Sequence, residues 1–336
     1  MKYEIKNVQD LLEKAASKFL TVEESRYFAE EQIETHLRKA PRTNVLKEAI
    51  DDIATWKNKS QNSVETMFEL PSLLKLNFNG LAPSLKIKWM HDQLEEKAKK
   101  NGIAILTVDN SAGMHTMHLW TQGLAKRGLF ALGAFNGGPL GVVPLGGTRG
   151  LLGTNPFTYA FPTQDSNIVI DMATSEIPYF EIVQAKKNNV PLRPNSAVDS
   201  SGKVTTDASS ALDEGGVSNL LPMGGNYKGY AFNYLIEVMT GAMIGAKLSS
   251  QQDPDYVYED HGGFLIAINI SAFNSLDKFK TDLEEMNAMI RNQKSADENP
   301  VLVPGDNNIQ RMKENLVSTD LELAESLFKE LEELAN

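Results

Sequence analysis

The fold class is decided by residues 103–135, IAILTVDNSAGMHTMHLWTQGLAKRGLFALGAF. This stretch begins with a short apolar run rich in β-forming residues, Ile103 to Val108, and it ends with a second apolar run, Leu129 to Phe135. Between them, Met114 to Lys126 has the apolar spacing of a helix. This strand–helix–strand order predicts an α/β fold built around a sheet.

Further helices and strands are expected on both sides of this stretch. Asn7 to Phe19 and residues 83–100 have helical spacing, and Asn101-Gly102 ends the second of these helices. Thr21 and Glu24 have the spacing of a capping box, in which each side chain satisfies a free backbone donor of the other residue at a helix start. Later in the chain the pattern predicts strands at 157–161, 168–170 and 261–270, a buried helix at 231–246 and amphipathic helices after residue 275, the last at 319–334.

We therefore expect two regions. Residues 1–100 form an N-terminal helical region on which residues 275–336 pack, and residues 101–274 form the α/β region. Residues 133–153 hold eight of the 24 glycines, which predicts a loop of tight turns or of close backbone approach. Residues 195–219, rich in Ser, Asp, Gly and Thr, are expected to form a long surface loop.

The composition excludes several classes of function. The 336 residues include 33 Lys and Arg and 44 Asp and Glu, a net charge of −11, which argues against a surface for nucleic acid or anionic lipid. The absence of cysteine excludes disulfides, thiolate metal sites and thiol nucleophiles. The charged start does not have a signal-peptide pattern, and no apolar run is long enough to cross a bilayer, so we expect a soluble, cytoplasmic protein.

Two common nucleotide-binding motifs are absent, and two histidines stand out. Neither G-x-G-x-x-G nor G-x-x-x-x-G-K-[ST] occurs, which disfavours a classical dinucleotide fold or a P-loop. His115 and His118 would share one face of the predicted helix. They are either one surface and one packed histidine, or acid–base groups, or metal ligands. Because no third protein ligand lies nearby in the sequence, we expect no metal.

Three polar clusters are candidate functional segments, and two of them could meet an anion. GTNP at 153–156 follows the glycine-rich loop, and DMATS at 171–175 follows a predicted strand directly, where a turn can expose backbone amides. GGNYKGY at 224–230 precedes the predicted helix 231–246. A cation at the start of a helix is disfavoured by the helix dipole. Lys228 is therefore either solvated or in contact with an anionic ligand.

These clusters, in this order, resemble the non-Rossmann malate/L-lactate dehydrogenase family, which includes ureidoglycolate dehydrogenase, sulfolactate dehydrogenase, 2,3-diketogulonate reductase and piperideine-2-carboxylate reductase. The resemblance covers most of residues 103–330. It rests on LGTNPFTYAFPT (152–163), IVIDMATS (168–175), DSSGKVTTDASSAL (199–212), GGNYKGYAF (224–232), GGFLIAIN (262–269) and VLVPGD (301–306).

The resemblance implies a non-Rossmann mixed-sheet α/β dehydrogenase fold, a homodimer, and a cofactor that is NAD or NADP, the choice being open. It also implies hydride transfer to or from C2 of a small 2-oxo or 2-hydroxy acid or of a cyclic imino acid. The region 101–274 then becomes the cofactor-binding region. The positions implied to bind the cofactor are Gly137, Thr154, Asn155, Ile170, Asp171, Met172, Ala173, Thr174, Ser175, Lys228, Pro304, Gly305 and Asp306.

The acid–base residues of the family pattern are replaced in this chain. When residues 37–38 are aligned with the family's Leu-Arg pair, Arg42 and Thr43 stand where its Ser-His begins, so Thr43 takes the place of the usual proton-donor histidine. The arginine that normally follows is Lys47 in this chain. A second family motif, Asn-Ser-Asn-His-Phe-Gly, aligns with residues 110–115, and Gly113 stands at the position of its histidine.

Three consequences follow as alternatives. In the first, His118, our preferred candidate, or His115 supplies the proton. In the second, the substrate is an iminium acid, which depends less on a general acid. In the third, the protein binds a dinucleotide without turnover, in a regulatory or scaffolding role. In an enzyme, Arg42 or Lys47 would orient the substrate carboxylate.

Overall fold

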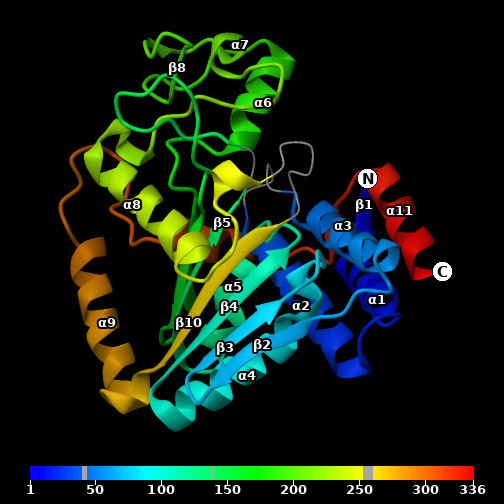
Figure 1. Cartoon of the computed structure of the whole chain (residues 1–336). Coiled ribbons are helices and arrows are strands. Elements are labelled where there is room, and N and C mark those ends of the chain that lie inside the picture. Colours follow the sequence, from blue (N-terminus) through cyan, green and yellow to red (C-terminus); the bar gives the residue numbers. More distant parts are fainter. Residues whose placement is uncertain (40–43, 138–139, 253–259) are drawn as a thin grey trace.

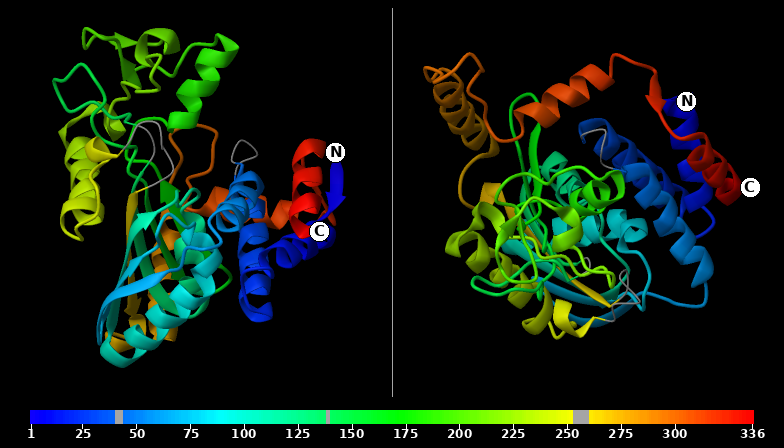
Figure 2. Two further views of the ribbon diagram at one scale, coloured as in Figure 1. Left: turned by 45° about the vertical axis from the view of Figure 1, so that its right-hand side comes forward. Right: turned by 90° about the horizontal axis from the view of Figure 1, so that it is seen from above.

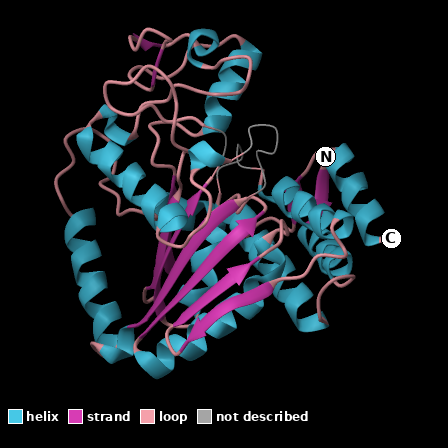
Figure 3. Ribbon diagram, viewed as in Figure 1, coloured by secondary structure: helices cyan, strands magenta, loops and turns pink. Residues whose placement is uncertain are grey.

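The computed structural model describes residues 1–39, 44–137, 140–252 and 260–336. At its centre is a mixed sheet of seven strands in the order β2-β3-β4-β10-β5-β6-β7 (Figures 1 and 3). β3 and β4 pair in parallel, and the other neighbours pair antiparallel. The strands are β2 (Glu65–Leu70), β3 (Leu73–Asn77), β4 (Ile103–Ser111), β5 (Leu129–Asn136), β6 (Phe157–Pro162), β7 (Asn167–Met172) and β10 (His261–Asn269).

The predicted strand–helix–strand unit is present as β4, α5 (His118–Lys126) and β5. α5 and α4 (Ile87–Asn101) pack on the sheet, where Leu106 of β4, Trp120 of α5 and Leu265 of β10 are fully buried. The helix was predicted to start at Met114, and this start is wrong. His115 has a φ of +49°, which a right-handed helix does not allow, so α5 begins at His118. The two histidines therefore do not share a helix face.

The N-terminal helices form a second hydrophobic core beside the sheet (Figure 2). α1 (Ile5–Ala16), α2 (Val22–Arg38) and α3 (Val45–Asn58) pack around Leu12, Phe28 and Ile50. The capping box is confirmed, since Thr21 Oγ1 accepts from the Glu24 N–H and the Glu24 carboxylate accepts from the Thr21 N–H. The prediction that residues 1–100 are helical is wrong for 65–77, because β2 and β3 join the main sheet there.

The C-terminal segment packs back on this helical region only from residue 306 onward, so the expectation for all of 275–336 is wrong for residues 276–291. α11 (Glu325–Ala335) contacts α1 and α3, and its Leu331 is fully buried. The helix predicted at 319–334 begins only at Glu325, because β11 (Asp320–Glu322) pairs with β1 (Lys2–Glu4). α10 (Asp306–Asn315) contacts α2 and β7, so it connects the two cores. α9 (Leu276–Arg291) lies at the opposite side of the molecule (Figure 1).

The middle of the chain forms a further lobe, drawn above the sheet in Figure 1. The expected loop 195–219 contains short elements of its own. The predicted helix 231–246 starts earlier, at Tyr227, and continues as one π-helical turn. The elements of this part are α6 (Tyr179–Asn188), β8 (Ala197–Val198), β9 (Val204–Thr205), α7 (Ala208–Ala211), the 3₁₀ turn Met223–Gly225, α8 (Tyr227–Glu237) and the π-helix Val238–Ala242. Elsewhere the chain has 3₁₀ turns at Pro83–Lys86, Ser249–Gln251 and Ile270–Ala272. No helix within the described ranges is long and apolar enough to cross a membrane.

Candidate active site at the end of strand β7

Asp171, near the end of β7, gathers three donors from two other parts of the chain. Its Oδ2 lies 2.7 Å from Lys39 Nζ, 3.0 Å from the Met117 backbone N and 3.3 Å from His118 Nδ1. Its side chain is only 10% exposed. Burial opposes the charged form of Asp171, but the charge of Lys39 and the hydrogen bond from His118 outweigh it and hold the pKa of Asp171 well below its usual range. The carboxylate is therefore ionised at neutral pH.

His118 is a buried, neutral link in this cluster. Burial lowers its pKa, the charges of Lys39 and Arg38 act in the same direction, and the hydrogen bond to Asp171 opposes them only in part. Because a carboxylate can only accept, Nδ1 carries the proton, and Nε2 accepts from the Asn308 amide at 3.3 Å. Arg311 in turn donates to Asn308 Oδ1 at 3.2 Å. Both ring nitrogens of His118 are thus engaged within the protein.

His115 lies in a different environment, against α3. Its Nε2 is 3.2 Å from Asp52 Oδ1, and its side chain is 19% exposed. Burial opposes the charged form, but the charge and hydrogen bond of Asp52, together with the charges of Glu48 and Asp51, raise the pKa of His115 to about 9. Glu48 also accepts from the Thr116 N–H and hydroxyl at 3.1 and 2.6 Å, which fixes the chain beside His115. His115 is therefore protonated at neutral pH.

The chain that leaves β7 enters a buried polar network. Thr174 Oγ1 donates to the Asn155 carbonyl at 2.9 Å and accepts from the Asn233 amide at 2.8 Å. The Asn155 amide donates to Glu237 Oε2 at 2.8 Å, and Asn155 itself is fully buried with a φ of +42°. Thr154 Oγ1 reaches the Gly137 carbonyl only at 3.5 Å. This network joins the strand ends to α8.

The glycine turn before α8 is attached to the same segment. The Met223 N–H donates to the Thr174 carbonyl at 2.9 Å, and the Gly224 N–H donates to Glu176 Oε2 at 2.6 Å. Gly224 and Gly225 have φ values of +71° and +57°, so this exposed turn is one that residues with side chains rarely adopt. Lys228, in the first turn of α8, is exposed and has no ion-pair partner in the described part of the chain.

The C-terminal turn 304–306 completes the group from the other side. Gly305, with a φ of +100°, begins α10 against β7, where a Cβ atom would lie 3.3 Å from Ile168 and 3.7 Å from Ile170. Pro304 is exposed, and Asp306 is held by Arg291 at 2.8 Å. Residues 170–173 are half-buried, so β7 offers surface to a ligand between this turn and the glycine turn.

The sequence-predicted positions are thus brought together, with exceptions at the proposed substrate end. Gly137, residues 154–155, 170–175, 228 and 304–306 all lie on or beside the end of β7 and the segment that follows it. Lys47 contacts Asp51 and lies 3.5 Å from Glu330, on a different face of α3 from Glu48 and Asp52. Arg42 and Thr43 fall outside the described residues. The roles of these residues stay predictions.

Several residues at this site could not be found by local reasoning. Lys39, Asp52 and Asn308 carry the contacts of Asp171, His115 and His118, yet each is far from its partner in sequence. Asn233 and Glu237 are similar cases in the polar network. The only sequence signal was for the last pair, since both are polar residues in the apolar run 231–246.

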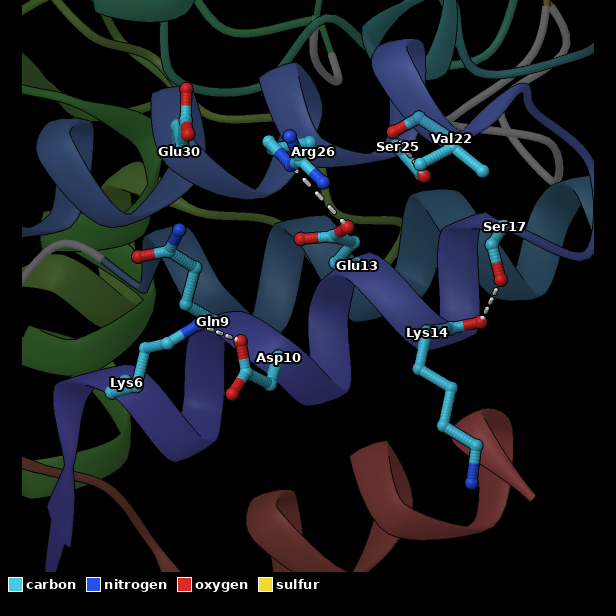
Figure 4. Close-up of a pocket in the computed structure, with 10 residues that line it drawn as sticks. All are labelled: Lys6, Gln9, Asp10, Glu13, Lys14, Ser17, Val22, Ser25, Arg26 and Glu30. Atoms are coloured by element: carbon cyan, nitrogen blue, oxygen red, sulfur yellow. Dashed lines mark hydrogen bonds and ion pairs between the residues drawn. The ribbon is translucent and has the colours of Figure 1, made fainter.

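A separate depression lies between α1 and α2, away from these residues (Figure 4). Its charged side chains pair with one another, as in the contact of Lys6 with Asp10 and that of Arg26 with Glu13 at 3.7 Å. No group of three or more His, Asp or Glu residues within the described ranges is placed to hold a metal ion. The end of β7 therefore remains the best candidate site.

Comparisons with known proteins agree with this fold and show the family. A sequence profile described as malate/L-lactate dehydrogenase matches residues 5–332. The malate/(S)-sulfolactate dehydrogenase of Methanothermus fervidus is 29% identical over 283 residues, which cover 82% of this chain and 80% of that protein. The delta(1)-pyrroline-2-carboxylate reductase of Agrobacterium fabrum is 36% identical over 188 residues, which cover 54% and 52%.

The crystal structure of malate dehydrogenase from Entamoeba histolytica superposes with a TM-score of 0.84 at 20% identity, covering 100% of this chain and 97% of that one. The fold is therefore a mixed-sheet α/β dehydrogenase fold, as predicted. The chain belongs to the malate/L-lactate dehydrogenase family, a family of oxidoreductase enzymes, and the family predicted from the sequence is confirmed.

Proposed function

We propose that this protein is an NAD(P)-dependent oxidoreductase that transfers a hydride to or from C2 of a small 2-oxo or 2-hydroxy acid or of a cyclic imino acid. The family supports an oxidoreductase. The relatives support the acid class, because one is named a malate/(S)-sulfolactate dehydrogenase and another a delta(1)-pyrroline-2-carboxylate reductase. The observation that carries the proposal is the convergence of the separate family motifs at the end of β7, beside ionised Asp171.

The residues at this place fit a dinucleotide. Lys228 is an exposed cation beside a turn of two left-handed glycines, which suits an anionic phosphate group. Ile170 and Met172 of β7 are half-buried and offer apolar surface. We assign the holding of the cofactor to residues 170–175, Lys228 and the turn 304–306. When bound, the nicotinamide supplies or accepts the hydride.

We assign the proton donor to His115 in preference to His118. Reduction of a 2-oxo acid builds an alkoxide that needs a proton, and a positioned acid is worth roughly 100- to 10,000-fold in rate. His115 is charged at neutral pH and partly exposed, and Asp52 orients its ring. His118 is neutral, and both of its nitrogens are bound to protein groups. An imino acid that is already cationic at nitrogen depends less on this donor.

The test is a reduction assay with both reduced dinucleotides. Oxaloacetate, pyruvate, sulfopyruvate and the five- and six-membered cyclic imino acids are offered with NADH and with NADPH, and the absorbance of the reduced nicotinamide is followed. We expect turnover of at least one acid, and a rise in melting temperature with the preferred dinucleotide, because ligands that bind only the native state stabilise it. A thermal shift without any turnover would favour a non-catalytic dinucleotide-binding role. No shift with either dinucleotide would refute the proposal. The family resemblance also supports a homodimer, which light scattering tests.

A further inference from the structure

Lys39 is a largely buried cation with donors to spare. It follows the last residue of α2, and its ammonium lies 2.7 Å from Asp171 Oδ2, with its side chain 16% exposed. An ammonium has three N–H donors. Within the described ranges, Asp171 is the only acceptor of the Lys39 side chain. A charged group removed from water is costly unless its donors find acceptors, so a further acceptor is expected here.

Asp171 does not need Lys39 for its hydrogen bonds. The same carboxylate oxygen also accepts from the Met117 N–H and from His118, at 3.0 and 3.3 Å. Lys39 therefore adds charge to a carboxylate that two other donors already hold. This arrangement leaves the ammonium positioned by Asp171 but able to contact a second anion.

The surroundings of Lys39 carry a surplus of positive charge. Arg38 is paired with Glu34 at 2.9 Å. Arg311 donates to the Arg38 carbonyl and to Asn308 Oδ1, and it has no acidic partner in the part of the chain that the structure describes. Three cations thus face two acids, Glu34 and Asp171, in a chain whose net charge is −11. Lys126 contacts both Glu31 and Glu34, so Lys126 and Glu31 together add one cation and one acid and leave this surplus unchanged.

Lys39 is also close to one of the two candidate histidines. It shares Asp171 with His118, three residues from the proposed proton donor His115. Lys47, which the family pattern suggests for carboxylate binding, is already between Asp51 and Glu330. We propose that Lys39 binds the carboxylate of the acid substrate and that Asp171 positions its ammonium. This assignment rests on the proposed function and names a residue that the family motifs do not include.

The test compares one ligand pair in several variants. Pyrrole-2-carboxylate resembles a planar cyclic imino acid, and pyrrole-2-carboxamide differs from it by lacking the charge. Their dissociation constants are measured by calorimetry on the full chain saturated with NADH or NADPH, whichever binds. The variants are Lys39→Met, Lys39→Arg and the control Lys329→Met, an exposed lysine of α11 paired with Glu325. The affinity for the dinucleotide alone is measured for each variant.

We expect the wild type and Lys329→Met to bind the acid roughly 10- to 100-fold more tightly than the amide, as for a charge-assisted hydrogen bond. Lys39→Met should bind both ligands equally weakly, and Lys39→Arg, which keeps the charge if Lys39→Met does not fold, should retain part of the preference. An unchanged preference in Lys39→Met, or the same loss of preference in Lys39→Arg as in Lys39→Met, would overturn the assignment.

Three outcomes separate this inference from the proposed function. If Lys39→Met weakens binding of the dinucleotide alone and leaves the acid-to-amide preference intact, Lys39 meets a phosphate and the carboxylate assignment is wrong. If the wild type binds neither dinucleotide nor acid, the proposed function is wrong, and the Lys39 assignment falls with it. If the wild type binds both and the preference ignores Lys39, only the Lys39 assignment falls.

Discussion

The charge on His115 gives the sharpest prediction, because Asp52 is the largest of the causes that raise its pKa. Asp52 lies 3.2 Å from His115 Nε2 and also accepts from the Ser84 hydroxyl. In Asp52→Asn the amide oxygen can still accept from Ser84, but the carboxylate charge is gone. Burial, which disfavours the charged imidazole, then acts with less opposition. We expect the pKa of His115 to fall from about 9 to its ordinary value of 6.5 or below.

The effect on stability follows from the two pKa values. A histidine with a pKa of 6.5 when unfolded and about 9 when folded stabilises the protein by about 3 kcal/mol. Because the folded-state value is the higher one, this contribution is complete below the unfolded value and is lost as the pH rises through about 9. Urea denaturation should therefore show the largest deficit of Asp52→Asn at acidic pH, and the deficit should shrink in alkaline buffer.

The effect on catalysis has the same pH dependence. With a substrate that needs a proton donor, the wild-type kcat/KM should fall on the alkaline side with a midpoint of about 9. In Asp52→Asn the midpoint moves below neutrality, so the rate at pH 8 should drop by at least about 30-fold, with a much smaller loss at pH 6. Asp51→Asn is the matched control, since Asp51 contributes only its more distant charge. If the alkaline limb stays in place in Asp52→Asn, or if NMR finds His115 titrating near 6.5 in the wild type, the reasoning is refuted.

Three other substitutions test the polar network and the glycine turn. Glu237→Ala leaves the Ser249 N–H, the Ser249 hydroxyl and the Asn155 amide without their buried acceptor. Urea denaturation should therefore show a loss of about 3 kcal/mol or more in the free energy of unfolding, while the control Glu332→Ala, at an exposed position, should change it little. Equal losses in the two variants would contradict the network. Gly229→Ala would place a Cβ atom 1.8 Å from the Met223 carbonyl oxygen and should lower the free energy of unfolding by at least about 2 kcal/mol. The control Gly215→Ala, whose Cβ would have its nearest contact at 3.5 Å, should leave the stability unchanged. An unchanged stability in Gly229→Ala would show that the turn can shift freely. Lys228→Ala should weaken dinucleotide binding about 10-fold in fluorescence titrations, and more strongly at low salt; unchanged affinity would remove Lys228 from the site.

Local sequence signals predicted the elements best. The Thr21–Glu24 capping box and the strand–helix–strand unit depend on neighbouring residues, and both are present. The strands β2 and β3 were not predicted. β2 is an edge strand with every residue exposed, so it lacks the apolar alternation that marks a strand. The start of α5 was misplaced because the positive φ of His115 is not visible in the spacing of apolar residues.

The candidate site was predicted only in part, for a similar reason. The family motifs identified the segments that meet at the end of β7, but they did not identify the partners. Lys39 and Asp171 are 132 positions apart, and Asn155 and Glu237 are 82 apart. Such contacts depend on how the two cores pack together, and no periodicity or short motif encodes that. The ionisation of His115 and His118 follows from these contacts. The sequence alone therefore gave no reason to prefer His115 to His118 as the proton donor.

The most direct test is a crystal structure of the protein with the reduced dinucleotide that stabilises it. We predict density along residues 170–175, with phosphate oxygens near Lys228 and the nicotinamide ring on the side of His115 and Lys39. Density that lies elsewhere, with packed side chains covering Ile170 and Met172, would contradict this prediction.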